Sequence, residues 1–229
     1  MIFVTGDTHG QLDFAKLTSF LRDAPRLTKN DYLIIAGDFS AVWSEKTLEE
    51  DLKPYCDLPF TVLFVDGNHE NFDLLNAYPV EEWKGGKVHI VKPDIIHLMR
   101  GQVFEIEGKT FFTFGGATSM DQATRRAHNL GWWAQELPTY EELDEGFRNL
   151  KRYHNKVDFI ITHACGERAL MYPPLRSRSF HMEPHFENHI LSNFEDIAEY
   201  SHWYFGHYHL DGDLNDKMTV LYRKIIRIV

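Results

Sequence analysis

The chain has 229 residues, of which 43% are apolar, so it is long enough to bury a sizeable core in one large domain or two small ones. Its formal net charge is −10 with neutral histidines, which argues against a protein that coats nucleic acid or an anionic membrane through a broad basic surface. A small anionic substrate remains compatible with this charge, because bound divalent cations would reverse the local field.

Cysteine usage and the N-terminus bear on the compartment. The two cysteines, Cys56 and Cys165, form neither a CxxC motif nor a disulfide framework, which favours a reducing environment. The apolar run Ile2–Val4 is too short for a signal peptide, and no later apolar stretch approaches about 18 residues. We therefore expect a cytoplasmic protein without a membrane-spanning segment.

The first hundred residues alternate between β-like apolar runs and helix-like segments, a pattern typical of βαβ units. The expected strands are Ile2–Thr5, Tyr32–Ala36 and Thr61–Val65. The expected helices lie near Leu12–Arg22 and Glu45–Tyr55, and a short helix follows Asn71.

From Val88 onward the apolar runs lie close together, which indicates antiparallel pairing. The runs are Val88–Val91, Ile95–Leu98, Val103–Ile106 and Thr110–Phe114. Glu107-Gly108-Lys109 supplies a hairpin turn between the last two runs.

After Gly115-Gly116, the segment Ala117–Pro138 contains Arg125, Arg126 and the pair Trp132-Trp133. It is too aromatic for a plain linker, so we expect a functional loop. The rest of the chain predicts further elements in this order: a helix at Tyr140–Tyr153, a strand at Phe159–Ile161, an irregular stretch at Arg168–Pro184, a helix at Phe186–Tyr200, and strands at Trp203–Phe205, Met218–Tyr222 and Lys224–Val229.

Five of the predicted strands are each followed by a short turn that carries side chains able to bind a metal. The seven candidate ligands are Asp7, His9, Asp38, Asn68, His163, His207 and His209. Buried strands deliver the turns that follow them to one edge of a sheet, so ligands far apart in sequence can meet there. Because the ligands extend from Asp7 to His209, the sequence favours a single domain over residues 1–229.

Each motif alone has a plainer interpretation. Gly-Asp turns are common after strands, a carboxylate such as Asp38 is more often a helix N-cap, and an HxH pair on a strand is more often structural than a ligand pair. Five such turns arising by accident on one chain is improbable. The joint occurrence therefore favours a metal site.

In order along the chain, the motifs DxH, GD, GNH[DE], H and GHxH resemble those of the calcineurin-like metallophosphoesterase superfamily. The resemblance covers almost the whole length. It implies an α/β fold of four layers, α/β/β/α, in which a β-sandwich with mixed sheets is flanked by helices. It also implies a binuclear metal centre at one end of the sandwich.

The resemblance assigns roles to the ligands residue by residue. One metal would take Asp7, His9, Asp38 and His209, and the other would take Asp38, Asn68, His163 and His207, so that Asp38 bridges. A hydroxide between the two cations would attack phosphorus in line. The mixture of imidazole, carboxylate and amide oxygen suits Mn, with Fe, Zn or Ni as alternatives, better than it suits Ca.

His69 lies one residue past a candidate ligand and outside the ligand set. In similar enzymes this position is catalytic, because it stabilises the transition state and protonates the leaving oxygen. The alternative is a histidine that only hydrogen-bonds around the ligands.

The sequence departs from the protein-phosphatase branch of the superfamily, which carries GDxxDRG. Here Ala41 and Val42 occupy the places of that branch's second Asp and its Arg. A phosphoprotein phosphatase is accordingly disfavoured, and the carboxylate that would orient His69 must come from elsewhere or be absent.

We therefore expect a metal-dependent phosphoesterase acting on a small phosphomonoester or phosphodiester, with a nucleotide-like substrate if the tryptophans line the entrance. Arg125 is the expected substrate-binding residue, with Arg126 as the alternative, since either could bind a phosphate oxygen. A surface arginine beside a Trp pair that plugs the core is the plainer interpretation.

The sequence gives weaker evidence for the roles of other loop residues. Arg176, Arg178 and His181 could serve the same purpose as Arg125, and Cys165 is expected to be a small buried apolar residue. A noncatalytic scaffold that binds a protein partner and a nuclease are the alternative functions. The complete ligand set argues against the scaffold, and the acidic chain argues against the nuclease.

Overall fold

Three predicted strands form the middle of a sheet because their side chains are almost all apolar on both faces. β1 (Ile2–Thr5), β2 (Tyr32–Ala36) and β3 (Thr61–Val65) have the expected bounds, and all of their residues except Tyr32 are buried. They pair in parallel, as strands covered on both faces commonly do. All three therefore end at the same edge of the sheet.

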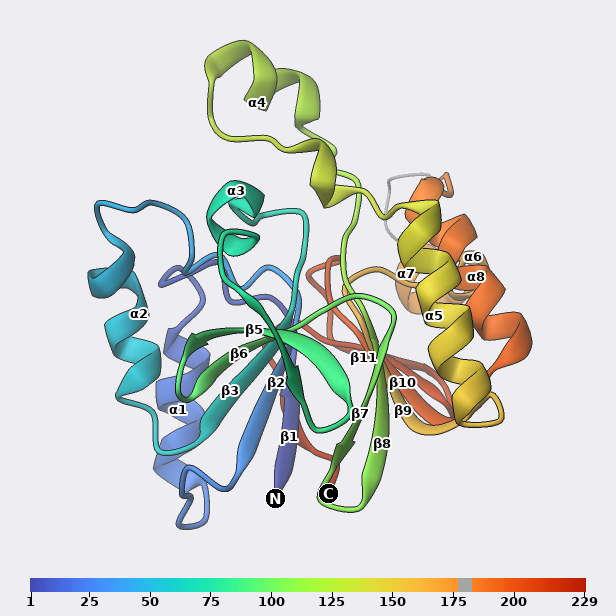
Figure 1. Cartoon of the computed structure of the whole chain (residues 1–229), viewed down its shortest axis with the longest axis horizontal. Coiled ribbons are helices and arrows are strands. Elements are labelled where there is room, and N and C mark those ends of the chain that lie inside the picture. The colour runs from blue at the N-terminus through green and yellow to red at the C-terminus, as the bar shows by residue number, and fades with distance from the viewer. Residues whose placement is uncertain (177–182) are drawn as a thin grey trace.

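The computed structural model describes residues 1–176 and 183–229, which form two mixed sheets between outer helices (Figure 1). One sheet has seven strands in the order β13-β1-β2-β3-β6-β5-β4, and the other has six in the order β11-β12-β10-β9-β8-β7. The remaining strands are β4 (Val80–Trp83), β5 (Gly86–Lys92), β6 (Ile95–Leu98), β7 (Gln102–Ile106), β8 (Lys109–Phe114), β9 (Lys156–Thr162), β10 (Glu199–Phe205), β11 (Gly212–Asn215), β12 (Met218–Val220) and β13 (Ile225–Arg227).

Helices cover the outer face of each sheet. α1 (Ala15–Asp23) and α2 (Leu48–Cys56) lie on the seven-stranded sheet, whereas α5 (Tyr140–Arg152) and α8 (Phe186–Ile197) lie on the six-stranded sheet (Figure 1). The four-layer α/β/β/α fold implied by the sequence is thereby confirmed. The shorter helices are α3 (Phe72–Leu75), α4 (Gln122–His128), η1 (Ala134–Glu136), α6 (Glu167–Leu170) and α7 (Pro173–Arg176).

Three buried apolar clusters hold these layers together. Along β1, Phe3 faces the cluster under α1 and α2, whereas Ile2 and Val4 face the cluster between the two sheets. This alternation follows from the two-residue period of a strand. The third cluster lies between the six-stranded sheet and its helices and includes Phe112 and Phe194, whose ring centroids are 4.8 Å apart.

The predicted antiparallel region is only partly antiparallel. β5 pairs with β6 and β7 with β8 in antiparallel fashion, and Glu107 and Gly108 both have positive φ, as the tightest hairpin turns require. However, β6 pairs in parallel with β3, and β8 pairs in parallel with β9. The two hairpins thus extend sheets that are otherwise largely parallel.

Several element bounds differ from the prediction for tertiary reasons. The last predicted helix ends at Ile197 rather than Tyr200, because Glu199 and Tyr200 pair with β9 at the start of β10. The edge strand β4 was missed, since its sequence Val-Glu-Glu-Trp is exposed and lacks apolar alternation. The functional loop contains α4 and η1, and the stretch predicted to be irregular contains α6 and α7.

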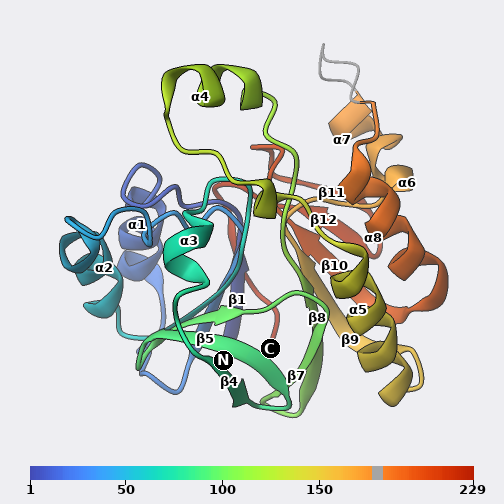
Figure 2. The ribbon, with the colours of Figure 1, turned by 45° about the horizontal axis from the view of Figure 1, so that its top comes forward.

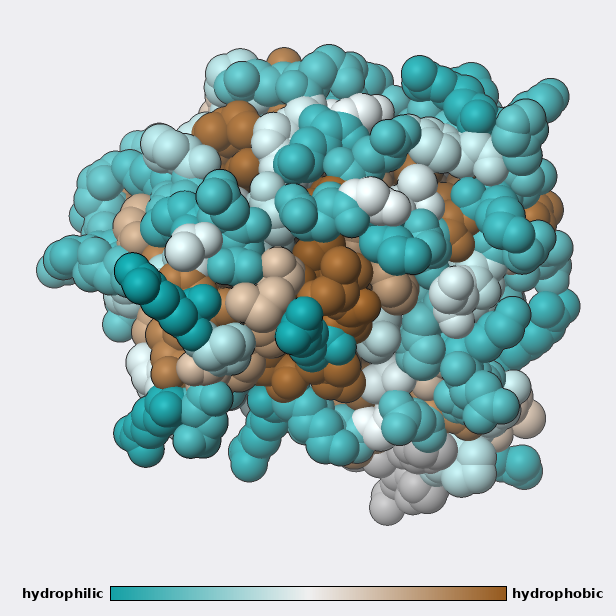
Figure 3. Space-filling model, turned by 90° about the horizontal axis from the view of Figure 1, so that it is seen from below, coloured by the Kyte–Doolittle hydropathy of each residue, from teal (hydrophilic) through white to brown (hydrophobic). Residues whose placement is uncertain are grey.

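The two ends of the molecule differ. Figure 3 shows the end that carries the chain termini, where apolar side chains gather in the middle of a polar surface. The half-buried side chains of Ile226, Ile228 and Val229 extend the central cluster. Within the described residues, every helix falls short of the length and apolarity that a membrane span requires. The turns that carry the candidate ligands lie at the opposite end.

Candidate metal centre

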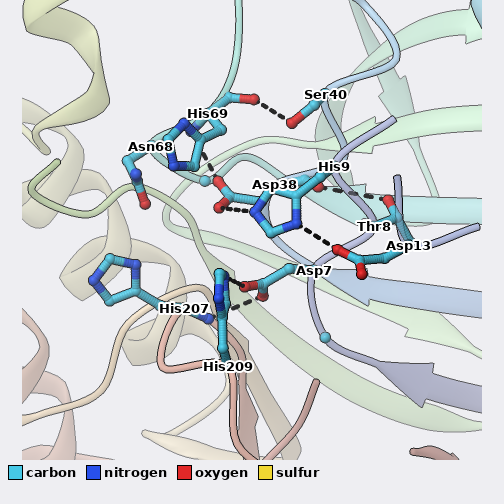
Figure 4. A network of polar contacts seen from close by, with 12 residues as sticks. Asp7, Thr8, His9, Asp13, Asp38, Ser40, Asn68, His69, His207 and His209 are labelled. Carbon is cyan, nitrogen blue, oxygen red and sulfur yellow. Dashed lines mark hydrogen bonds and ion pairs between the residues drawn. The ribbon is translucent and has the colours of Figure 1, made fainter. Parts of the chain in front are cut away.

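The five predicted turns meet where β1, β2, β3, β9 and β10 end. Figure 4 shows labelled residues of the turns after β1, β2, β3 and β10. The backbone N–H of His207 donates to Asp7 Oδ1 at 2.9 Å, and His209 Nε2 lies 3.1 Å from Asp7 Oδ2. On the other side of the site, His163 Nε2 lies 3.1 Å from Asn68 Oδ1. Residues from both sheets thus face one small volume.

Asp38 lies between the two halves of this cluster. Its Oδ1 is 3.3 Å from His163 Nε2 and accepts the backbone N–H of His69 at 2.8 Å, while its Oδ2 is 3.2 Å from His9 Nε2. The N-cap interpretation of Asp38 is wrong, because Thr47 occupies the N-cap position of the next helix, α2. Each carboxylate oxygen therefore faces a different imidazole.

Two groups of side chains have potential ligand atoms within 4.8 Å of one another. The first consists of Asp7, His9 and His209, and the second of His9, Asp38 and His69. Both groups share His9, which links four of the candidate ligands and His69. His163 joins them through its contacts with Asp38 and Asn68, and His207 through its backbone contact with Asp7. The sequence predicted the convergence of all seven candidate ligands, and the structure brings them together.

Glycines let the turns approach this closely. At Gly37, whose φ is +92°, an added Cβ would overlap the ring of His163. At Gly67, an added Cβ would overlap the carboxylate of Asp38. These two glycines are required by the backbone conformation and by the space that the neighbouring side chains occupy.

The histidine pair lies in the turn that follows β10, as predicted, and not on a strand as in the plainer interpretation. His207 and His209 lie beyond the strand, in a turn where both have positive φ, of 66° and 48°. The ring of His207 packs edge-on against that of His163 at a centroid separation of 5.0 Å, while that of His209 packs against His9 at 5.1 Å. The turn, rather than one face of a strand, sends the two rings towards different partners.

The electrostatics of the cluster are set by two buried carboxylates. Burial opposes their charge, but His209 and His163 lower the pKa of Asp7, and His163 and His9 hold the pKa of Asp38 well below its usual range. Conversely, burial works against a charged His9 and His163, but the carboxylates raise the pKa of His9 to about 9 and that of His163 to about 10. The site thus stabilises ionised carboxylates and needs compensating positive charge.

Two further imidazoles, those of His207 and His69, are kept neutral. Burial and the neighbouring His163 lower the pKa of His207 to about 3. Burial also lowers the pKa of His69, with Arg125 and His9 adding to the effect against the opposing charge of Asp38. A neutral imidazole can act as a ligand or exchange a proton near neutral pH.

His69 is held by its backbone. Its N–H donates to Asp38, and its carbonyl accepts the Ser40 hydroxyl at 2.5 Å. Among the described residues, no carboxylate hydrogen-bonds to its ring, so the orienting group expected from the phosphatase branch is absent from this part of the chain. The ring instead packs edge-on against His9 at a centroid distance of 5.6 Å.

Glu70 supports the same turns and was not singled out from the sequence. Its carboxylate accepts the backbone N–H groups of Phe39 at 2.8 Å and Ser40 at 3.0 Å. Burial and the charge of Asp38 raise its pKa to about 8. The fourth position of the GNH[DE] motif was the available signal, since a carboxylate is the natural acceptor for backbone N–H groups in a turn.

The segment 117–138 lies over this end of the molecule and projects α4 above it (Figures 1 and 2). Asn68 Nδ2 donates to Ser119 Oγ at 3.2 Å, and Ser119 in turn donates to the buried carboxylate of Glu136. The base of the segment is thereby tied to a candidate ligand. No residue of α4 itself is buried.

The arginine and tryptophan residues of this segment are largely placed by local contacts. Arg125 Nε is 2.9 Å from both carboxylate oxygens of Asp121, and its Nη1 donates to the carbonyl of Gly131 at 3.3 Å. Trp133 Nε1 donates to Asp73 at 2.8 Å, and the Arg126 guanidinium lies 4.9 Å from the Trp132 ring centroid.

The expectation that the Trp pair plugs the core is not met. Both half-buried tryptophans lie outside the three apolar clusters, and the ring of Trp133 instead packs edge-on against Trp43 at a centroid distance of 5.6 Å. Trp43 belongs to the loop that follows Asp38. The aromatic contact therefore connects the segment to a ligand-bearing loop.

The stretch Arg168–Pro184 contributes less to the candidate site than the segment 117–138 does. Arg176 is exposed at the end of α7, whereas Arg178 and His181 lie outside the described residues. Cys165 is buried as expected, and its thiol donates to the Tyr208 hydroxyl at 3.2 Å. Burial raises the pKa of this thiol, which makes it unreactive.

A family model for calcineurin-like phosphoesterases matches residues 1–211. The chain belongs to this family. A phosphoesterase of this family is a hydrolase that typically uses divalent metals. Among curated proteins, no sequence matches the chain significantly.

This calcineurin-like phosphoesterase is similar at low identity to several solved structures. A protein assigned as a 5′-nucleotidase from Staphylococcus aureus has a TM-score of 0.47 and 15% identity over 98% of this chain and 49% of that one, so the chain spans about half of its length. Phosphopantetheinyl hydrolase from Mycobacterium tuberculosis has a TM-score of 0.44 and 15% identity over 96% and 87% of the two chains. A serine/threonine phosphatase from Saccharomyces cerevisiae has a TM-score of 0.37 and 16% identity over 96% and 66%.

The donor set of the phosphoesterase fits divalent transition metals. Two fully buried carboxylates, Asp7 and Asp38, converge with imidazole nitrogens and one amide oxygen, and no thiolate takes part. Hard oxygen and borderline nitrogen donors suit Mn, Fe, Zn or Ni, whereas calcium prefers oxygen alone. Cations at this position would also supply the positive charge that the carboxylates require.

Proposed function

We propose that the protein is a binuclear metal-dependent phosphoesterase, formed by residues 1–229 as one domain, that hydrolyses a small phosphomonoester or phosphodiester. The position of Asp38 supports this proposal most directly, since its two oxygens face His163 and His9 on opposite sides. A carboxylate in that position can bridge two cations about 3.5 to 4 Å apart, the separation used in two-metal hydrolysis.

The ligands divide into two sets around Asp38. One cation would be held by Asp7, His9, Asp38 and His209, and the other by Asp38, Asn68, His163 and His207. When bound, the cations would lower the pKa of water and neutralise phosphate oxygens. Mn is the first metal to test, with Fe, Zn and Ni as the alternatives.

His69 is the proposed catalytic acid. Among the described residues its ring makes no protein hydrogen bond, so a ring nitrogen can take up a proton, and the imidazolium that results can donate this proton to the leaving oxygen of the ester. Burial lowers the pKa of the ring, so the negative charge of a bound phosphate is needed to favour the protonated form. The contacts of its backbone with Asp38 and Ser40 fix the position of the backbone from which the ring extends. A donor of this kind contributes typically about 10²- to 10⁴-fold to the rate.

The segment 117–138 would bind the rest of the substrate. Arg125 is the proposed phosphate-binding residue, because it lies close enough for its charge to lower the pKa of His69. The half-buried Trp43, Trp132 and Trp133 offer stacking surfaces beside the ligand-bearing loops, which supports a nucleotide-like substrate.

The test is hydrolysis of an aryl phosphate and an alkyl phosphate, each with and without added Mn²⁺. Asp38→Asn should lose activity by more than the roughly 10- to 100-fold typical of residues that only support ligands. His69→Ala should keep its metal, as elemental analysis would show, and should lose far more activity on the alkyl phosphate, because aryl leaving groups need less protonation.

Asp57→Asn is the matched control, since Asp57 is exposed and, within the part of the chain that the structure describes, forms an ion pair only with Lys53. Unchanged turnover in Asp38→Asn would contradict the bridging role. An equal loss on both substrates in His69→Ala would assign His69 a supporting role in place of proton donation. A purified wild type that neither holds nor responds to divalent metal would overturn the proposal as a whole.

A further inference from the structure

The imidazole of His9 is held at both of its nitrogens (Figure 4). Its Nε2 faces Asp38 Oδ2 at 3.2 Å, and its Nδ1 lies 2.7 Å from Asp13 Oδ2. A carboxylate at Nδ1 accepts the N–H there, which leaves the lone pair of a neutral ring on Nε2, towards the metal centre. Asp13 therefore fixes both the orientation and the tautomer of His9.

Asp13 is itself held by Tyr222. The Tyr222 hydroxyl donates to Asp13 Oδ1 at 3.0 Å, so each carboxylate oxygen has a separate partner. The backbone N–H of Asp13 also donates to the carbonyl of Thr8 at 3.0 Å, which ties the residue to the same turn as His9. Asp13 has little freedom to rotate away.

Tyr222 also contacts a second candidate ligand. Its ring stacks on that of His209, with a centroid separation of 4.6 Å and an interplanar angle of 13°. The Tyr222 backbone is fixed in turn, because its N–H donates to Asp211 at 2.8 Å and its carbonyl accepts the Lys16 ammonium at 2.5 Å. One tyrosine thus supports His209 directly and His9 through Asp13.

The opposite half of the centre is supported differently. His163 Nδ1 lies 2.9 Å from the carbonyl oxygen of Ala36, a neutral backbone acceptor. Among the described residues, a carboxylate outside the candidate ligand set contacts an imidazole of that set only in the half of the centre that contains His9. An anionic acceptor makes an imidazole a stronger electron donor than a neutral carbonyl does.

We propose that Asp13 and Tyr222 are positioning residues that set the affinity of the metal subsite formed by Asp7, His9 and His209. The inference rests on the proposed metal-dependent function. It deepens that function, because it makes the two subsites unequal and assigns control of one of them to residues that touch no metal.

The experiment is a calorimetric titration of the chelator-treated, full-length protein with Mn²⁺, comparing the wild type with Asp13→Ala, Asp13→Asn and Tyr222→Phe. The wild type should bind in two steps. Asp13→Ala should weaken one step by about 10- to 100-fold and leave the other unchanged. Asp13→Asn should fall between, because an amide oxygen still accepts the His9 N–H without the charge.

Tyr222→Phe separates the two contacts of Tyr222. The variant loses the hydroxyl that holds Asp13 but keeps the ring that stacks on His209, so its effect should be smaller than that of Asp13→Ala. The visible absorption of Co²⁺-loaded protein, which reports ligand geometry at the metal, should change in Asp13→Ala. Asp57→Asn is again the exposed control and should match the wild type in both measurements.

The outcomes separate the two levels of inference. Two unchanged steps in Asp13→Ala would overturn the positioning role while leaving the phosphoesterase intact. Asp13→Asn is the variant least prone to misfold. Equal weakening of both binding steps in this variant would overturn the claim that Asp13 sets the affinity of one subsite only. A wild type that takes up no Mn²⁺ or Co²⁺ at all would overturn the proposed function, and the positioning role with it.

Discussion

The backbone N–H of His207 donates to the carboxylate of Asp7 at 2.9 Å, although the two residues are 200 positions apart in sequence. Asp7 follows β1 of the seven-stranded sheet and His207 follows β10 of the six-stranded sheet. The contact therefore joins the ends of the two sheets. It holds a fully buried carboxylate in place by a group that carries no charge of its own.

Replacing Asp7 by Asn should separate stability from metal binding. The amide oxygen can still accept the His207 N–H, but the substitution removes a carboxylate whose pKa His209 and His163 lower in the folded protein. At neutral pH we therefore expect the metal-free variant to be less stable than the metal-free wild type, and to gain much less stability from Mn²⁺. Thermal unfolding with chelator and with Mn²⁺ measures both quantities; a full Mn²⁺ response in the variant would contradict the ligand role.

Metal removal should lower the stability of the wild type by mass action. A ligand that binds only the folded state at about 100 times its Kd adds about 2.7 kcal/mol. For a chain of this size each kcal/mol shifts the Tm by roughly 2 to 4 °C, so saturating metal should raise the Tm by roughly 5 to 11 °C. A Tm that stays the same over a thousandfold range of Mn²⁺ concentration would argue against a specific metal site in the folded protein.

The sequence predicted the strands and the ligands better than the residues that support them. β1, β2 and β3 were identified because their sequences are almost wholly apolar, and the candidate ligands were proposed because each stands in a short motif directly after a strand. Asp13 gave no such signal, since an acidic residue before a helix is common. Its role depends on Tyr222, 209 positions away, which only the folded chain brings near.

The same limit applies to the segment above the site. Its tryptophans predicted a functional loop, but α4 buries none of its residues and so lacks the apolar stripe by which helices are recognised. The turn of His207 and His209 was predicted to follow a strand, but its conformation was not, because sequence periodicity does not report positive φ at residues other than glycine.

Arg100 is expected to be critical for stability. Its guanidinium is buried against the buried carboxylate of Asp66, with Nε donating at 2.9 Å and Nη2 at 2.5 Å, and it also binds Glu142 at 3.1 Å. Burial opposes ionisation of Asp66, but Arg100 and His97 hold its pKa well below the usual range. Arg100→Met would leave this charge uncompensated and should cost about 3 to 5 kcal/mol of unfolding free energy.

Urea denaturation of the chelator-treated protein measures this cost. The exposed pair Lys53–Asp57 supplies the comparison, because solvent screens it and Lys53→Met should leave the stability almost unchanged. Adding Asp66→Asn to Arg100→Met should recover part of the loss, since the buried charge is then removed. If Arg100→Met and Lys53→Met lowered the unfolding free energy equally, the buried pair would contribute no more to stability than the exposed pair.

His89 should make the protein sensitive to mild acid. Its Nδ1 lies 3.1 Å from His97 Nδ1, and only 2% of the residue is exposed. Burial and the neighbouring His97 lower its pKa from 6.5 to about 4. Between pH 6.5 and pH 4 the unfolded chain therefore binds a proton that the folded chain does not. The stability that the neutral ring contributes is fully present above pH 6.5 and is lost as the pH falls towards 4.

Removing this imidazole should flatten the acid limb of the stability curve. We expect His89→Leu to be less stable than the wild type at pH 7, because His97 Nδ1 loses its contact with His89, but to lose less additional stability between pH 6.5 and pH 4.5. Urea denaturation of chelator-treated protein across this range gives the slope without interference from metal binding. His154→Asn, at an exposed histidine with positive φ, should keep the wild-type slope. If His89→Leu kept it as well, the acid sensitivity would have to arise from groups other than His89.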